Sequence, residues 1–397
     1  MVDEIPLRSS GDYLDVSHQL ALKSRRELRS IPYPPRLLFF VNSGRESTDG
    51  RRVREFRKRL SCAPESDVLY RDDHGKLRSI PVLLRAARRL RPHLIYVELF
   101  GYSGLVGGIL AKLLWGCKLG IGNGDEVFST HLKNGRYVRA LLSGALDLFL
   151  RRFADLSAVW SPYYRRWLQA RGVRNVVCVP GCVDLSCLAP VSSEGLRQRL
   201  GLEGSLVVGV VGNLQYSRKL DMVFGWDLVE ALSYLRDLKI KGLVVGDGPG
   251  LDRLQAMAKE FDVVDRVVFV GRVPHDSLAA YYSVMDVGLI TLSNDLDAKF
   301  TWTAKLPEYL ACNVFPVMTD TERSRRFVRQ CGELLPFVGL KDRMYPSRLA
   351  AFLRHILSGP KTLERRKHGR EIARGLMSFE VGTRHLERGI HRAIQGR

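Results

Sequence analysis

Residues 305–320 read Lys305-Leu-Pro-Glu-Tyr-Leu-Ala-Cys-Asn-Val-Phe-Pro-Val-Met-Thr-Asp320, a helical pattern that leads directly into an apolar strand. The spacing predicts a helix over 304–311 and a buried strand over Val314–Met318. Asn313 stands where the helix must end, and asparagine is the second choice after glycine for the left-handed residue just past a helix. A helix that feeds a buried strand is typical of α/β domains with parallel sheets.

The same stretch has the features of a ligand site. Lys305 and Glu308 are three positions apart, so they share one face of the predicted helix. Lys305 also lies near the helix N-terminus, where unpaired N–H groups and the positive end of the dipole attract phosphate. A cation beside a carboxylate suits a nucleotide, because the cation matches phosphate and the carboxylate accepts hydrogen bonds from ribose hydroxyls.

Helical and β-rich runs alternate through the first half of the chain, which predicts a Rossmann-like domain over 35–190. Strands are expected at Arg36–Val41, Asp67–Tyr70, Leu94–Glu98, Lys118–Ile121, Leu156–Trp160 and Val176–Pro180. Helices are expected between them, at 50–60, 79–91, 103–115, 134–152 and 161–171. Residues 1–34 lack strong periodicity and are expected to form an N-terminal arm.

The alternation restarts after Pro190, which predicts a second Rossmann-like domain over 191–375. Its strands are expected at Leu206–Val211, Gly242–Val245, Arg266–Val270, Val287–Thr291, Val314–Met318 and Glu333–Pro336. Its helices are expected at 220–236, 250–262, 276–284, 304–311, 322–329 and 346–357, before a basic helical tail at 361–374 and 383–395. The C-terminal helix, within 376–397, is expected to cross back to the first domain. Two α/β domains are expected to face a cleft, where strand ends meet ligands.

A second motif supports a nucleotide-binding site. Val244-Val-Gly-Asp-Gly-Pro249 follows a strand and opens a helix, and its glycines allow a tight turn. Alone, Gly-Asp-Gly more often marks an ordinary turn. In order and near spacing, however, it precedes Glu308, Ala311 or Cys312, Pro316 and Val317, and this set resembles the donor site of GT-B glycosyltransferases of family 4. The resemblance covers most of residues 205–340. Asn313 replaces the family's glycine, and Phe300 stands where the family usually carries a glutamate, with Asp295 or Asp297 as the nearby acids.

The resemblance implies a metal-independent transferase without a cofactor, which moves a sugar from a nucleoside diphosphate to an acceptor, with retention. It implies that Glu308 binds ribose and Lys305 binds phosphate. The other donor-binding residues it implies are Gly212, Asn213, Gly246, Asp247 and Gly248. Arg218 and Lys219 are expected to stabilise the charge of the leaving diphosphate as catalytic groups. The alternative is that this pair is a solvated loop.

The acceptor side falls in the first domain by the same resemblance, from Leu94 to Glu126. Asp125 is the expected catalytic residue there, acting on the acceptor hydroxyl proton or orienting the sugar. The alternative is that Asp125 is only the N-cap residue of the next helix. The remaining residues expected on this side are Asn42, Ser43, Gly44, Glu98 and Glu126.

The chain is strongly basic: 62 basic against 42 acidic residues give a formal net charge of +20. The excess lies in residues 1–190. Arginine-rich helices at 51–59 and 85–91 carry apolar stripes, which predicts association with an anionic membrane and fits a lipid-linked acceptor or a cell-surface glycan precursor. Solvated helix faces are the alternative.

Other classes remain open. The length suits two domains, and seven cysteines, an odd number, indicate reduced thiols in the cytoplasm. No cleavable signal is expected, and the most apolar window, Gly104–Cys117, is shorter than the roughly 20 residues that span a bilayer. The protein is therefore expected in the cytoplasm, at most peripheral to the membrane.

A nucleic-acid-binding protein is the competing class, although no recognition motif supports it. A sugar-nucleotide epimerase, a phosphorylase and a catalytically impaired GT-B protein are further alternatives.

Overall fold

The computed structural model describes residues 34–396 apart from short gaps. These gaps are Pro64, Phe100, 124–126, Asn134, Pro180, Arg218 and Lys219, 294–299, Thr301, 322–323, 326–327, Arg329 and Pro360. The chain forms two compact units. Unit 1 contains the residues up to Cys182, Phe300–Trp302 and the residues from Met377 onward, and unit 2 contains Val183–Lys299 and Thr303–Leu376.

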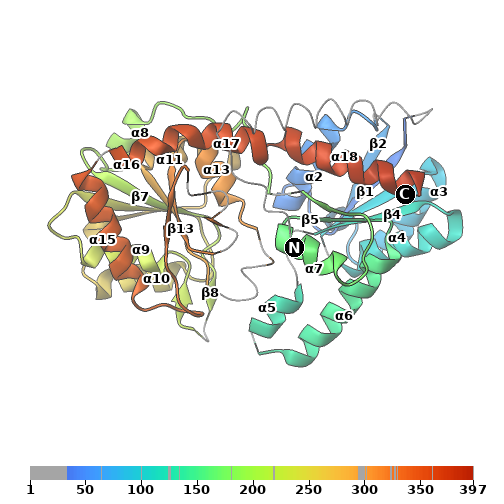
Figure 1. Ribbon diagram of the computed structural model, residues 1–397, viewed down its shortest axis with the longest axis horizontal. Coiled ribbons are helices and arrows are strands. Elements are labelled where there is room, and N and C mark those ends of the chain that lie inside the picture. Colours follow the sequence, from blue (N-terminus) through green and yellow to red (C-terminus); the bar gives the residue numbers. More distant parts are fainter. Residues whose placement is uncertain are drawn as a thin grey trace. The chain divides into compact units, whose positions relative to one another are not determined.

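Unit 1 is built on a six-stranded sheet whose order is β2-β1-β3-β4-β5-β6 and whose neighbouring strands are all parallel (Figure 1). The strands are β1 (Leu37–Val41), β2 (Ser66–Tyr70), β3 (Leu94–Glu98), β4 (Lys118–Asn123), β5 (Leu156–Val159) and β6 (Val176–Cys178). All six predicted strands of this half are present. The inner strands β1, β3 and β5 are buried along their whole length, because helices cover both faces of the sheet.

Two groups of helices cover the sheet of unit 1 (Figure 1). One face packs against α2 (Thr48–Arg59) and α18 (Phe379–Gln395). The other face packs against α3 (Ser79–Leu90), α4 (Tyr102–Trp115) and α6 (Tyr137–Phe153). The other helical elements among the described residues of unit 1 are η1 (Arg71–Asp73), α5 (Val127–Lys133) and α7 (Pro162–Gln169), of which η1 and α5 are not predicted from the sequence.

Unit 2 has a second six-stranded parallel sheet, in the order β11-β10-β7-β12-β13-β14. Its strands are β7 (Leu206–Val211), β10 (Ile240–Val245), β11 (Val267–Gly271), β12 (Val287–Ile290), β13 (Phe315–Thr319) and β14 (Glu333–Leu335). These again match the six predicted strands. Read in chain order, the arrangement is 3-2-1-4-5-6, the doubly wound order of dinucleotide-binding domains.

Helices α9 (Trp226–Ser233), α10 (Leu251–Glu260) and α15 (Tyr345–Ser358) share one core with the sheet of unit 2. The others are α8 (Glu194–Arg199), η2 (Val264–Arg266), η3 (His275–Ser277), α11 (Leu278–Val284), α13 (Lys305–Ala311), α16 (Lys361–Glu364), η4 (Arg365–His368) and α17 (Gly369–Leu376).

The helix predicted at 220–236 is wrong in its first part. Residues Tyr216–Ser217 (β8) and Met222–Val223 (β9) pair as a two-stranded antiparallel ribbon. The helix starts only at Trp226, after Gly225 with φ 93°. A residue with positive φ interrupts a helix, so this glycine separates the ribbon from α9.

Both sheets reverse their strand order beside the first strand of the unit. In unit 2 the reversal lies between β7 and β12, and in unit 1 it lies between β1 and β3. Ligands of open α/β sheets bind outside the carboxyl ends of strands at such points. The loops after β7 and β1, at Gly212 and Asn42, are therefore the first places to look for a site.

Candidate functional site

The loops after β7 and β10 touch each other in unit 2. Gly212 has φ 139° and Gly246 has φ 141°, a backbone conformation that L side chains rarely adopt. The amide N–H of Gly212 donates to the carbonyl oxygen of Val245 over 2.9 Å. A Cβ on Gly246 would lie 1.9 Å from the carbonyl oxygen of Gly212. Only glycines allow these two loops to approach so closely.

The next residues of both loops continue this contact. The amide of Leu214 donates to the carbonyl oxygen of Asp247 over 3.0 Å. The Asp247 carboxylate accepts a hydrogen bond from the amide of Gly248 over 2.7 Å. A Cβ on Gly248 would lie 2.4 Å from Oδ1 of Asn213. The structure therefore brings together the five loop residues that the sequence places at the donor.

Lys305 completes this cluster from α13. A Cβ on Gly212 would lie 2.6 Å from Cε and 3.0 Å from Nζ of Lys305. The ammonium group also lies 5.2 Å from the centre of the Phe224 ring. The carboxyl end of β7 thus carries a positive charge directly beside glycine backbone. Such a surface is suited to a phosphate group.

Glu308 lies one helical turn after Lys305 and has a buried partner. The hydroxyl of Tyr282 donates to Oε2 of Glu308 over 2.5 Å. Burial and the nearby charge of Glu308 raise the pKa of Tyr282 well above its usual value, so this phenol remains a neutral donor. Tyr282 therefore orients the carboxylate of the partly buried Glu308.

The short helix α13 is fixed at its C-terminal end. Asn313 has φ 56°, which confirms the predicted left-handed residue. The guanidinium of Arg370 donates to the carbonyl oxygens of Ala311, over 2.5 Å, and of Leu188, over 2.8 Å. The sequence missed both Tyr282 and Arg370 as supports of α13. The Tyr281-Tyr282 pair is the only sequence signal for the first, and no local pattern indicates the second.

Several predicted site residues lie outside the described residues. These are Arg218 and Lys219, expected at the diphosphate, Asp125 and Glu126, expected at the acceptor, and the loop acids Asp295 and Asp297.

In unit 1, Asn42 holds the loop after β1. Asn42 is fully buried, and its Nδ2 donates to the carbonyl oxygen of Leu99 over 2.7 Å while its Oδ1 accepts from the amide of Gly104 over 3.2 Å. Leu99 has φ 68°, a strained value for a leucine. The side chain expected to face an acceptor instead ties two backbone segments at the switch point of the sheet. The hydroxyls of Ser43 and Ser47 lie 2.7 Å apart, and Gly44 packs beside Asp72.

Glu98 is also an internal residue. It is 1% exposed, and its Oε1 lies 3.5 Å from Nε of Arg52. Burial raises its pKa to about 7, although the charge of Arg52 opposes the shift. Arg52 in turn donates to the carbonyl oxygen of Val179 over 3.0 Å and lies 4.4 Å from the Trp160 ring centre. Glu98 and Arg52 therefore form a buried pair of unit 1.

The arginines of the predicted basic helix 51–59 are thus partly engaged within unit 1. Arg52 is buried, and Arg59 pairs with Glu380 over 2.9 Å and also with Glu55. Helix α2 is therefore not a fully free cationic face, because some of its arginines form contacts within unit 1.

Phe300 has a role that the sequence did not indicate. It is fully buried in unit 1. Its ring centre lies 5.2 Å from Tyr163, 5.3 Å from Tyr164, and 5.7 Å from both Phe128 and Trp167. The position where the resemblance implies a glutamate is therefore part of an aromatic core of unit 1.

Among the described residues, no three His, Cys, Asp or Glu side chains come together in a way that would hold a metal ion. All seven cysteines are free thiols. In the part of the chain that the structure describes, no helix is both long and apolar enough to cross a membrane.

Solved structures with two such sheets define the fold class. The structure is similar to sucrose-phosphate synthase from Thermosynechococcus elongatus, with a TM-score of 0.70 and 18% identity over 88% of this chain and 96% of that chain. It is also similar to HepE from Anabaena in complex with UDP and glucose, with a TM-score of 0.67 and 16% identity over 89% of this chain and 98% of that chain. The fold is that of the GT-B glycosyltransferases.

The sequence comparisons are more specific. Residues 205–345 match the family model of glycosyl transferases group 1. The chain is 36% identical over 124 residues to 2-deoxystreptamine glucosyltransferase of Streptomyces kanamyceticus, which is 30% of each protein. It is 33% identical over 115 residues to the GDP-mannose-dependent alpha-(1-6)-phosphatidylinositol monomannoside mannosyltransferase of Mycolicibacterium smegmatis, 28% of each. The chain thus spans less than a third of the length of these two curated relatives.

Proposed function

We propose that this protein is a glycosyltransferase that binds a nucleoside-diphosphate sugar in unit 2. The observation that carries the proposal is the position of the Lys305 ammonium against Gly212, with Glu308 one turn further along the same helix. Cation, glycine backbone and oriented carboxylate match the phosphate and ribose of one ligand. The solved structure of HepE, a protein of the same fold, contains UDP and glucose, which supports this ligand class.

The roles follow from charge and position. Glu308, oriented by Tyr282, accepts hydrogen bonds from ribose hydroxyls, and Lys305 binds phosphate beside the loops of Gly212 and Gly246. Arg218 and Lys219, which follow β7 in the sequence, are proposed to stabilise the diphosphate as the glycosidic bond breaks. Cations aimed at a leaving group that gains charge lower the barrier more than they strengthen substrate binding. This chemistry requires neither a metal ion nor another cofactor.

The acceptor is proposed to be a sugar or a lipid-linked sugar, with retention at the transferred carbon. Asp125 is the proposed group for the acceptor hydroxyl proton. One of the two relatives described above is named for a phosphatidylinositol mannoside acceptor, which supports a lipid-linked class. The excess of basic residues in residues 1–190 is also compatible with an anionic lipid. A place in the cytoplasm, at the membrane surface, belongs to this proposal.

Replacement of Glu308 by glutamine tests the donor site. Glu308→Gln keeps the size of the side chain but removes the charged acceptor, so donor binding should weaken by about 1.5 to 3 kcal/mol. The donor is first chosen by thermal shift from a panel of UDP-, GDP-, ADP- and dTDP-sugars. Calorimetric titration then measures the dissociation constants of both proteins.

The matched control is Glu203→Gln, because Glu203 is an exposed glutamate of the same unit. Its dissociation constant should equal that of the wild type. An unchanged constant for a folded Glu308→Gln protein would remove Glu308 from the site. A wild-type protein that none of the nucleotide sugars stabilises would contradict the proposed function itself.

A further inference from the structure

Helix α4 carries its large apolar residues on the outside. Its buried side, which faces the sheet and α3, holds small residues, which are Ser103, Gly104, Gly107, Gly108 and Ala111, together with Leu105. The residues between 37% and 75% exposed are Tyr102, Val106, Leu110, Leu113, Leu114 and Trp115. A helix that faces water normally has the reverse distribution.

The close packing of α4 explains this inversion. A Cβ on Gly104 would lie 2.6 Å from Phe40, and one on Gly108 would lie 2.8 Å from Leu119. No space remains beneath these positions for a larger side chain. The helix therefore packs on the sheet through glycine, and its bulky residues point away from the core.

Helix α6 is inverted in a different way. Its buried side contains an ion pair, because Asp147 and Arg151 are 3.0 Å apart, and the Tyr164 hydroxyl donates to Asp147 over 2.5 Å. Its exposed side carries large apolar residues. These are Tyr137, Val138, Leu141, Leu142, Leu146 and Phe149, of which four are more than 65% exposed. At 100° per residue, these six positions cover about half of the helix circumference.

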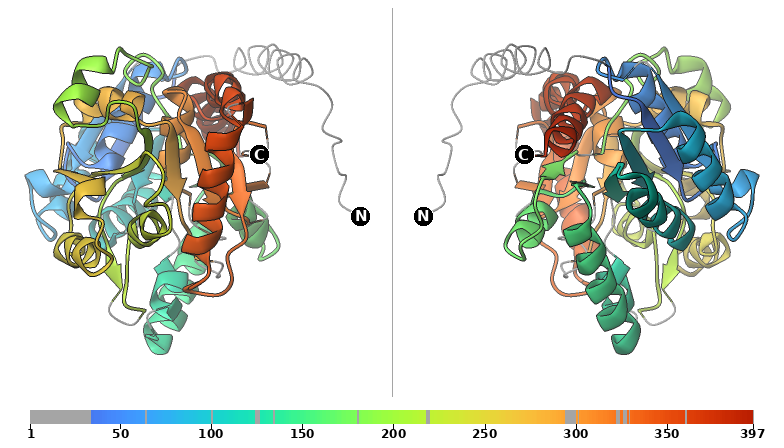
Figure 2. Two further views of the ribbon diagram at one scale, coloured as in Figure 1. Left: turned by 90° about the vertical axis from the view of Figure 1, so that its left-hand side faces the viewer. Right: turned by 90° about the vertical axis from the view of Figure 1, so that its right-hand side faces the viewer.

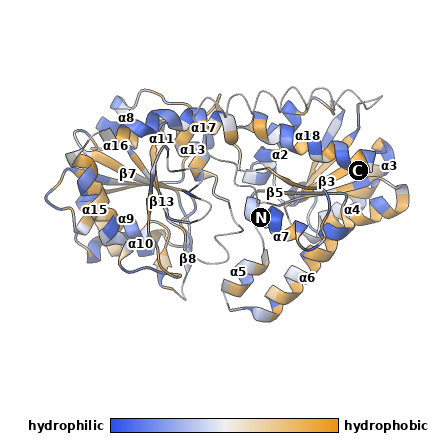
Figure 3. Ribbon diagram, in the orientation of Figure 1, coloured by the Kyte–Doolittle hydropathy of each residue, from blue (hydrophilic) through white to orange (hydrophobic). Residues whose placement is uncertain are grey.

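The two helices are neighbours in unit 1. Both pack on the same face of the sheet of unit 1. Nζ of Lys112 in α4 donates to the carbonyl oxygen of Phe153 at the end of α6 over 2.8 Å. Figure 3 colours much of α4 and α6 as hydrophobic, and in the views of Figures 1 and 2 the N-terminal part of α6 extends beyond the sheet. We call the twelve exposed residues given above the outer apolar face.

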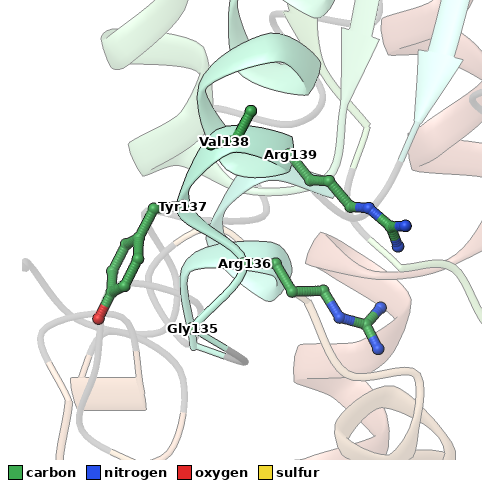
Figure 4. A pocket seen from close by; sticks show the side chains of 5 residues that line it. All are labelled: Gly135, Arg136, Tyr137, Val138 and Arg139. Carbon is green, nitrogen blue, oxygen red and sulfur yellow. The ribbon is translucent and has the colours of Figure 1, made fainter.

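The sequence of the two helices is poor in acidic residues, and the exposed acids Asp72 and Asp73 lie before the basic segment at 76–78. Residues 99–124 and 127–146 contain no acidic residue, and Asp147 is buried. Arg136 and Arg139 are exposed at the start of α6, where they line a shallow hollow and extend in the same direction, while Tyr137 points the opposite way (Figure 4).

The N-terminal end of α4 has a similar basic border. Ser103 donates through its hydroxyl to the carbonyl oxygen of Lys76 over 2.6 Å. This bond places the exposed sequence Lys76-Leu77-Arg78 beside α4, and Leu77 is 84% exposed. Apolar residues bordered by cations therefore occur at both ends of the surface.

We propose that the outer apolar face is a docking surface for an anionic lipid bilayer. Single exposed apolar residues are common, but six on each of two neighbouring helices mark an interaction surface. Exposed leucines and phenylalanine would enter the acyl boundary, while Tyr102, Trp115 and Tyr137 would lie at the headgroup level. The exposed cations Arg136 and Arg139 at the start of α6, a helix with no exposed acidic residue, complement anionic headgroups.

The proposal names a surface other than the helices that the sequence indicated. It rests on the proposed function in one respect only, because docking would bring unit 1 to a lipid-linked acceptor. Binding to lipid and binding to nucleotide remain separately measurable.

Vesicle sedimentation tests the surface with the full-length protein. The probes are phosphatidylcholine vesicles with and without a third of phosphatidylglycerol. The triple variant Leu141→Ser, Leu142→Ser, Phe149→Ser should reduce binding to the anionic vesicles about tenfold or more, because these side chains no longer enter the lipid. The control is Val264→Ser, Val338→Ser, Met344→Ser, which removes three residues of unit 2 that are 55% to 70% exposed. It should bind as the wild type does.

A second variant separates charge from apolar insertion. Arg136→Glu with Arg139→Glu should weaken binding to anionic vesicles and leave binding to neutral vesicles unchanged. Salt should act in the same direction, because it screens surface charges within about 10 Å at 0.1 M. The proposal would be overturned if the wild-type protein did not bind anionic vesicles, or if it bound neutral vesicles equally well.

The surface could instead pair with a second copy of this chain, and light scattering distinguishes that outcome. A wild-type dimer that the leucine and phenylalanine variant converts to a monomer, without lipid binding, would also overturn the proposal. Thermal shift with the preferred nucleotide sugar is recorded on each preparation. Lost nucleotide binding with intact lipid binding would count against the proposed function alone.

Discussion

Asp227 and Glu308 are acids of unit 2 in different surroundings. Glu308, proposed to bind ribose, is partly exposed and oriented by Tyr282. Asp227, in the first turn of α9, is 1% exposed and accepts a hydrogen bond from the Thr291 hydroxyl. Burial raises its pKa to about 6, although the bond from Thr291 opposes the shift. Asp227 therefore affects stability rather than ligand binding.

Asp227→Asn should stabilise unit 2, and more so at higher pH. The folded pKa, about 6, lies above the ordinary value of 3.8, so folding favours the protonated form. The contribution of Asp227 is fully present below pH 4 and is lost as pH rises through 6. The gain from asparagine should therefore be about 1.4 kcal/mol larger at pH 8 than at pH 5.

Hydrogen exchange of unit 2 peptides in increasing urea measures this difference. Thr291→Val serves for comparison, since it removes the bond but keeps the carboxyl group. A loss of stability in Asp227→Asn that is equal at both pH values would contradict the assignment.

Residue patterns predict that the loops proposed to bind the donor lie together, because their glycines and charges form local motifs. Gly212, Gly246 and Lys305 were identified from motif order, and the structure brings them together. Tyr282 was not identified as the partner of Glu308, because the contact joins positions 26 residues apart on different elements. The burial of Asn42 was missed for the same reason, since its partners lie at Leu99 and Gly104.

At the scale of elements, all twelve strands of the two large sheets are predicted, and the inner strands most clearly, because parallel strands buried on both faces are continuous apolar runs. The ribbon of β8 and β9 was missed. Each of its two strands has only two residues, too few for an apolar run, and the two strands pair with each other across the turn between them. Helix position was predicted better than helix orientation: nothing in the local pattern of α6 shows that Asp147 faces inward.

Gly104→Ala tests the close packing of α4. The new Cβ would lie within 2.8 Å of Phe40, Asn42 and Val97 in a fully packed core. Such overpacking typically costs about 1 to 3 kcal/mol, which should lower the thermal midpoint by several degrees. Differential scanning calorimetry measures the shift.

Gly195→Ala is the matched control, because it also lies in a helix, α8, but nothing lies within 4 Å of its Cβ position. That change should be neutral or stabilise by about 0.5 to 1 kcal/mol. If both variants had the same midpoint, α4 would not be confined against the sheet.

At the scale of the molecule, the chain enters unit 1 three times. Residues up to Cys182 form most of it, and Phe300–Trp302 and the residues from Met377 complete it. The predicted boundaries lie at 190/191 and 375/376, and the sequence did not indicate the excursion at Phe300. That excursion depends on rings from α5 and α7, far away in sequence, so no local pattern reports it.

Removal of residues 377–397 should unfold unit 1 and spare unit 2. Phe379, Leu386 and Ile390 are buried in the core of unit 1, and each contributes roughly 1.5 to 3 kcal/mol. Their sum approaches the whole stability of a typical domain, about 5 to 15 kcal/mol. Glu387 also accepts hydrogen bonds from Ser61 and Cys62, over 2.7 and 3.2 Å from their amides.

Limited proteolysis with mass spectrometry distinguishes the two units. Peptides from unit 1 should be cut rapidly in the truncated protein, while those from unit 2 remain protected. Leu386→Ala is the milder comparison, with an expected loss of about 2 to 5 kcal/mol. Equal protection of both units after truncation would show that α18 is dispensable.

The position of α18 in the sequence also determines the order in which the two units can complete their cores during synthesis. Every residue of unit 2 leaves the ribosome before Phe379, so unit 2 can complete its core while unit 1 still lacks a helix on one face of its sheet. The strands β1, β3, β5 and β6 then expose apolar side chains for as long as translation of about 200 further residues takes, roughly 10 to 40 seconds. A chaperone that binds exposed apolar strands should therefore be recruited by the nascent first half of this chain.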